Sequence, residues 1–96
     1  MATVTASVTT TRARDYMRKL CIHWSHRFEV SFDEKAGSIQ FGDGKQALLQ
    51  VQDNALLVTV SSADEAGLSK LADVVAEHIS RYAQKESLQF VWNNAD

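Results

Sequence analysis

Apolar and polar residues alternate along much of the chain, which is the period-two pattern of half-buried β-strands. Near the N-terminus, Val4, Ala6 and Val8 fall on one side and threonines and serines fall on the other. The same alternation returns after Arg27 and continues to Val60. It predicts strands over residues 2–9, 28–32, 39–41, 47–51 and 56–60.

Two other segments place apolar residues three and four positions apart, as an amphipathic helix does. The first follows the threonines at 9–11, which offer a capping hydroxyl, and should end near His26. The second opens at Ser62-Ala63-Asp64-Glu65, which reads as a capping box with Ser62 as the N-cap. The first buried stripe comprises Ala13, Tyr16, Met17, Leu20 and Trp24, and the second comprises Leu68, Leu71, Ala72, Val75, Ile79, Tyr82 and Ala83.

The turns fix how neighbouring strands pair. A two-residue turn at positions 53–54 sets Val51 opposite Leu56, so that inward residues meet inward residues. A two-residue turn at positions 43–44 would instead set Phe41 opposite Gln46, with the faces out of phase. We therefore expect a three-residue loop that pairs Phe41 with Ala47, or a β-bulge, near Gly44.

These elements predict an α+β fold in one domain spanning residues 1–96. The order is β-α-β-β-β-β-α, with a further strand expected over residues 87–92. Consecutive hairpins make the sheet antiparallel, with about five or six strands. Both helices must bury one stripe, and the simplest packing lays them side by side on one face of the sheet.

The other face of this sheet is polar but mostly uncharged, and Leu48 and Leu57 interrupt it. The predicted pairing makes these leucines diagonal neighbours. They are either isolated surface residues or the centre of a surface for a ligand or a homodimer. Ile22 lies opposite the buried stripe of its helix, so it is either exposed or contacts another element or chain.

Composition excludes several classes of protein. The net charge of −2 argues against a nucleic-acid-binding module, which usually carries a basic face. No apolar run approaches the roughly 20 residues of a membrane helix. The first ten residues lack the basic start and apolar stretch of a signal peptide. Together with a single cysteine, these features predict a cytoplasmic protein.

The densest group of reactive side chains lies at the end of the first helix. His23 and His26 are three residues apart and point the same way, with Lys19 between them. His78, at the edge of the second helix's stripe, would complete a three-histidine site for a transition metal if the helices are neighbours. The histidines could equally be structural, or could handle an anion or a proton. Cys21 points away and is expected to be a small core residue.

Three segments resemble a small bacterial family of unknown function, number twenty-two eighteen. They are HWSHRFEVSFDE (residues 23–34), GSIQFGDGK (37–45) and AEHISRYAQKESLQFVW (76–92), so that the resemblance covers nearly the whole chain. It implies a single-domain bacterial cytoplasmic protein, and a link of some members to iron or siderophore utilisation. It implies no catalytic residue or cofactor. The positions that match its pattern are His23, Trp24, His26, Arg27, Phe28, His78 and Arg81.

Three functional classes follow. The first is a non-enzymatic binding or accessory domain, linked to iron or siderophore handling, that uses the three histidines with Lys19, Arg27 or Arg81 as supporting cations. The second is a small enzyme with a histidine as acid or base. The third is a structural module that forms a homodimer through the polar sheet face.

Overall fold

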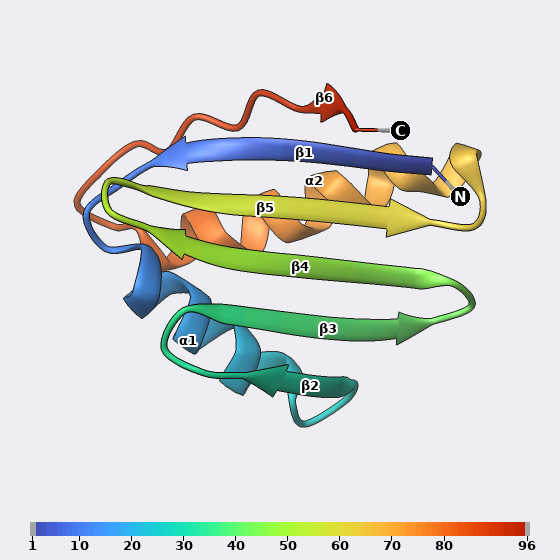
Figure 1. Cartoon of the computed structure of the whole chain (residues 1–96), viewed down its shortest axis with the longest axis horizontal. Coiled ribbons are helices and arrows are strands. Elements are labelled where there is room, and N and C mark those ends of the chain that lie inside the picture. The colour runs from blue at the N-terminus through green and yellow to red at the C-terminus, as the bar shows by residue number, and fades with distance from the viewer. Residues whose placement is uncertain (1, 96) are drawn as a thin grey trace.

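A computed structural model describes residues 2–95 and shows a six-stranded antiparallel sheet with both helices on one face (Figure 1). The elements are β1 (Ala2–Thr9), α1 (Ala13–Trp24), β2 (Glu29–Phe32), β3 (Ala36–Gly42), β4 (Lys45–Gln52), β5 (Ala55–Ser62), α2 (Glu65–Tyr82) and β6 (Asn93–Asn94). In the sheet they stand in the order β2-β3-β4-β5-β1-β6. The predicted α+β class and the order of elements are confirmed.

The β4–β5 hairpin has the predicted register. Val51 lies opposite Leu56, Leu49 opposite Val58, and the turn occupies residues 53 and 54. Leu49, Leu56 and Val58 are buried, so the inward side chains of the two strands meet as the alternation requires.

The β3–β4 hairpin lacks the three-residue loop and contains the other predicted alternative, a β-bulge, which lies at Phe41, three residues before Gly44. Gln40 pairs with Gln46 and Gly42 pairs with Lys45, so Phe41 is the extra residue. A two-residue turn at Asp43-Gly44 then closes the hairpin, and both residues have positive φ, 55° and 75°. The predicted pairing of Phe41 with Ala47 is therefore wrong. The bulge restores the phase that the short turn alone would have broken.

The helix starts also differ from the expected capping residues. Asp64 is the N-cap of α2, and its carboxylate accepts a hydrogen bond from the backbone N–H of Ala66. Ser62 lies two residues earlier, and its hydroxyl accepts a hydrogen bond from the backbone N–H of Asp64. At α1 the N-cap is Arg12, and the hydroxyl of Thr10 accepts from its backbone N–H at 3.0 Å.

The sixth strand exists but is shorter and later than predicted. Only Asn93 and Asn94 pair with β1, opposite Thr5 and Val4. Residues 87–92 run along the sheet without strand pairing, as Figure 1 shows for the red segment beside β1. Leu88, Phe90 and Trp92 alternate with exposed residues and pack against the core. This segment is therefore held by side-chain packing.

The sheet and both helices share one hydrophobic core. The inward faces of β1, β3, β4 and β5 meet the buried stripes of α1 and α2. Met17 and Leu20 from α1 and Val75 and Ile79 from α2 are fully buried. No helix in the described part of the chain is long and apolar enough to cross a membrane.

Candidate functional site

The two helices run in opposite directions and form a groove on the helical side of the molecule. His23, near the end of α1, lies beside His78 in α2. Tyr16, two turns earlier in α1, contacts Glu86, which follows the end of α2. Most of α1 thus lies along the second half of α2, because each helix has an apolar stripe to bury on the same sheet.

Trp24, the last residue of α1, packs where α1 meets α2 and β3. It is only 5% exposed, and its ring centroid lies 4.8 Å from that of His78 and 5.0 Å from that of Phe41. Phe28 packs edge-on against Phe41 at 5.0 Å, and its backbone N–H donates to the carbonyl of Trp24. The HWSHRF segment therefore supplies aromatic core residues that join the end of α1 to β3 and to α2.

The two histidines of the groove are neighbours. Their ring centroids are 5.7 Å apart, with His23 exposed and His78 half-buried. Nδ1 of His78 lies 2.8 Å from the carbonyl oxygen of Val74. A carbonyl oxygen can only accept, so Nδ1 carries a hydrogen and Nε2 is left to bind a ligand or a proton.

The third predicted ligand does not join them. Within residues 2–95, no group of three histidine, cysteine or acidic side chains is placed to hold a metal ion, so His26 does not complete a site with His23 and His78. Cys21 is fully buried, as expected for a core residue, and burial raises the pKa of its thiol to about 11. Two imidazoles alone fall short of the three or four ligands of a zinc site.

Cations gather along the same helices. A hollow of about 450 Å³ between α1 and the end of α2 is lined by Arg12, Lys19, Arg81, Tyr82, Gln84 and Lys85, and we call it the basic groove. Four of these residues are cationic and none is acidic. Lys19 and Arg81 are predicted site residues that the structure brings together, whereas Arg27 does not line this groove.

The imidazole pair continues the basic groove. His23 is four residues beyond Lys19, and His78 is three residues before Arg81, so each lies one helical turn along the same helix face. Lys19 and Arg81 each form an ion pair on their own helix, with Asp15 at 3.1 Å and Glu77 at 2.7 Å. These pairs are at least half exposed, and such pairs contribute little to stability. Both cations can therefore turn toward a ligand at small cost.

Tyr82 is a neutral hydrogen-bond donor of the basic groove. It is half-buried, and burial raises the pKa of its hydroxyl, while the positive charges of Arg81 and Lys19 act in the opposite direction. The hydroxyl therefore keeps its proton at neutral pH and can donate a hydrogen bond to an acceptor on a ligand.

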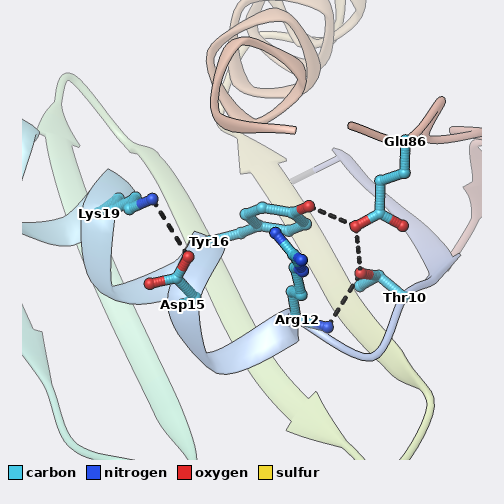
Figure 2. Close-up of polar contacts among 6 residues, drawn as sticks. All are labelled: Thr10, Arg12, Asp15, Tyr16, Lys19 and Glu86. Carbon is cyan, nitrogen blue, oxygen red and sulfur yellow. Dashed lines mark hydrogen bonds and ion pairs between the residues drawn. The ribbon is translucent and has the colours of Figure 1, made fainter. Parts of the chain in front are cut away.

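Glu86, which follows the end of α2, contacts the start of α1 and was not predicted from the sequence. Figure 2 shows the hydroxyls of Tyr16 and Thr10 both directed at the same carboxylate oxygen of Glu86. These hydrogen bonds, with Tyr16's as the stronger influence, lower the pKa of Glu86. Burial, and then Glu86 itself, raise the pKa of Tyr16. A tyrosine inside a buried stripe needs an acceptor, which is the one signal the sequence offered.

The opposite face of the sheet holds a second hollow, of about 580 Å³. Leu48 and Leu57 line it and are diagonal neighbours as predicted, because Leu48 pairs with Thr59 and Gln50 pairs with Leu57. Ile22 is 42% exposed and lies on α1, on the other side of the molecule, so it does not belong to this surface.

Comparisons with known proteins place the chain in a family. The NMR structure of PA4090 from Pseudomonas aeruginosa is similar, with 38% sequence identity and a TM-score of 0.82 over 97% of this chain and 96% of that chain. No curated protein matches. A bacterial family matches residues 5–93. The chain belongs to this family, which is described as "Uncharacterized protein conserved in bacteria (DUF2218)".

Proposed function

We propose that this chain is a single non-enzymatic domain of the bacterial cytoplasm that binds a small anionic ligand in the basic groove. One observation carries the proposal. The groove is a hollow of about 450 Å³ lined by four cations and no carboxylate, in a chain whose net charge is −2. Because acidic residues outnumber basic ones overall, cations gathered in one hollow indicate a local anion site.

The lining residues supply the donors that such a ligand needs. Arginine offers a planar pair of N–H groups that matches a carboxylate or phosphate, and lysine offers a mobile point charge. Tyr82 and Gln84 add neutral donors between them. Charge-assisted hydrogen bonds of this kind contribute about 1.5–3 kcal/mol each. Two or three of them contribute about 3–9 kcal/mol in total. After the entropy lost on binding, this supports affinity in the millimolar range.

The resemblance to a family linked to iron or siderophore utilisation makes ferric chelates candidate anionic ligands of the basic groove. Ferric citrate presents carboxylates to a site of this kind, so it fits the groove by charge without requiring a protein-bound metal. A bare transition metal has weaker support, because among residues 2–95 the adjacent pair His23 and His78 gains no third ligand. Ferric citrate is therefore one of the ligands with which the basic groove should be tested.

Titration calorimetry with inorganic phosphate, citrate and ferric citrate tests the proposal. We expect Lys85→Gln to weaken binding about tenfold, which is the loss of one charge-assisted hydrogen bond. Lys70→Gln is the matched control, because Lys70 is an exposed lysine of α2 that does not line the groove. Equal weakening by both variants would reduce the effect to net charge and contradict a site.

Zinc ion alone is the probe for the metal alternative. Saturable zinc binding that His23→Ala abolishes and Lys85→Gln leaves intact would assign the histidine pair to a metal and overturn the anion proposal. If none of the three anions binds at millimolar concentration, the basic groove is not an anion site.

A further inference from the structure

The face of the sheet away from the helices almost lacks charge. Figure 1 looks onto this face, with both helices behind it. Its outward positions, read from the strand pairing, are Thr3, Thr5, Ser7 and Thr9 in β1, Ala55, Leu57, Thr59 and Ser61 in β5, Gln46, Leu48, Gln50 and Gln52 in β4, Ala36, Ser38 and Gln40 in β3, and Glu29 and Ser31 in β2. Glu29, on an edge strand, is the one charged residue among these described positions. We call this surface the neutral face.

This absence of charge is selective. The whole chain has 22 lysine, arginine, aspartate and glutamate residues among 96, taken as 10 basic and 12 acidic. An exposed sheet face of a monomer normally takes its share of them, because lysine and glutamate keep a protein soluble and block edge-to-edge and face-to-face association. The neutral face lacks almost all of these charged residues, so little on it opposes association with another surface.

Its centre is apolar. Leu48 is 41% exposed and Leu57 is half-buried, and both line the hollow of about 580 Å³ together with Gln50 and Thr59. Asp33, which follows β2, is the one charged residue of this lining. Apolar residues ringed by mostly uncharged polar ones form the core-and-rim arrangement of protein interfaces. Depletion of charge at the core is the composition that separates an interface from the remaining surface.

We propose that the neutral face binds a second copy of this chain, related by a twofold axis through the Leu48 and Leu57 region. In such an interface the same patch is used twice, so any charge near the axis would meet its own copy and repel it. The charges of this face, Glu29 in β2 and Asp33 directly after it, both belong to the β2 edge of the sheet, whereas Leu48 and Leu57 belong to the central strands β4 and β5. A partner that carried net charge would instead call for complementary charge on the face.

The face is also large enough. The molecule measures 33 Å and 27 Å along its two longer axes, which lie in the plane of the sheet as Figure 1 shows. A surface of this size is comparable with the roughly 800 Å² per partner that a stable interface buries. Two such sheets pack face to face about 10 Å apart. Both helical layers then lie outside, and the basic groove stays open in each copy, so this proposal stands independently of the anion site.

Sedimentation equilibrium of the full chain tests the dimer. We expect reversible association at concentrations well below about 1 mM. We expect Leu48→Glu alone and Leu48→Lys alone to weaken association at least about tenfold, because each places like charges near the axis. Mixing the two variants should restore association as a heterodimer, since the opposite charges then face each other.

Ile22→Glu is the matched control, because Ile22 is equally exposed but lies on α1 and should leave the dimer intact. A wild-type chain that stays monomeric up to about 1 mM overturns the proposal and leaves the face to another partner. Association that survives Leu48→Glu, or that Ile22→Glu disrupts to the same extent, also overturns it. Restoration in the mixture cannot arise from misfolding of the single variants, so it identifies the face directly.

Discussion

Gly37 in β3 lies close beneath α1, and an alanine there should destabilise the fold. An added Cβ would lie 2.9 Å from Sγ of Cys21 and 3.1 Å from Cβ of Phe32. Both distances are well inside the roughly 3.5–4.0 Å at which non-bonded heavy atoms attract one another. Overpacking of a buried site costs about 1–3 kcal/mol. The gain of about 0.5–1 kcal/mol from replacing a glycine in a strand offsets part of that cost. We expect Gly37→Ala to lose about 1–2 kcal/mol of unfolding free energy.

Cys21→Ala should rescue this variant, because the nearest clashing atom is the sulfur itself. Alone, Cys21→Ala removes one buried heavy atom and should cost about 1 kcal/mol, as the deletion of a buried methyl group does. In the double variant the new methyl group occupies space that the sulfur has left. The two costs should therefore fall short of additivity by about 1 kcal/mol or more.

Urea unfolding followed by circular dichroism measures the stability of the wild type, the two single variants and the double variant, which together form a double-mutant cycle. In a domain of this size each kcal/mol also moves the melting temperature by about 4–8 °C. Gly67→Ala is the control, because its added Cβ would meet no atom closer than 3.6 Å and should raise helix stability by up to about 1 kcal/mol. Additivity of Gly37→Ala and Cys21→Ala within about 0.5 kcal/mol would refute the close approach of α1 to β3.

Three further predictions concern the core and the groove. Trp24→Ala should cost about 3–5 kcal/mol in urea unfolding, whereas the exposed Ile22→Ala stays within about 0.5 kcal/mol; similar losses would contradict the packing of Trp24 against α2 and β3. Because burial raises the pKa of Cys21 to about 11, its thiol should resist a disulfide reagent at neutral pH until the chain unfolds, and fast labelling of the native protein would be the opposite result. Because the pKa of Glu86 is lowered in the folded protein, its contribution to stability is present above about pH 4.3 and is lost as the pH falls through the lowered pKa. Tyr16→Phe removes the first cause of this shift and should reduce the fall in melting temperature at acid pH. An unchanged pH profile would show that the Tyr16–Glu86 hydrogen bond does not form in solution.

The sheet register was predictable where the alternation of apolar and polar residues agrees with the pairing that a two-residue turn imposes. The turn at residues 53–54 puts inward residues opposite one another, and its register followed from the alternation alone. At the turn of residues 43–44 the alternation alone did not give the register, because Phe41 is an extra, bulged residue in β3. Phe41 still points inward to meet Trp24, so packing against α1 decides where the extra residue goes. Such a long-range contact leaves no mark in the local sequence.

The candidate site was predictable only in part. Helix phase placed His23 and His78 at facing edges of two helices, and the structure makes them neighbours. The same phase placed His26 beside His23, but α1 ends at Trp24, so the turn that follows moves His26 off that face. The residues around Glu86 gave no signal of their own, because a glutamate in a polar loop usually faces water, and the buried Tyr16 indicated only that some acceptor was needed. Its role depends on the buried hydroxyl of Tyr16, seventy positions earlier.

Amide chemical-shift mapping with citrate and inorganic phosphate tests the anion site most directly. We predict saturable shifts confined to the basic groove, at the amides of Lys19, Arg81 and Lys85, with smaller shifts at His23 and His78 one turn away. Higher salt should weaken the effect, because the groove acts through charge. Shifts that centre on Leu48 and the neutral face, or that spread over the surface without saturating, would contradict an anion site between α1 and α2.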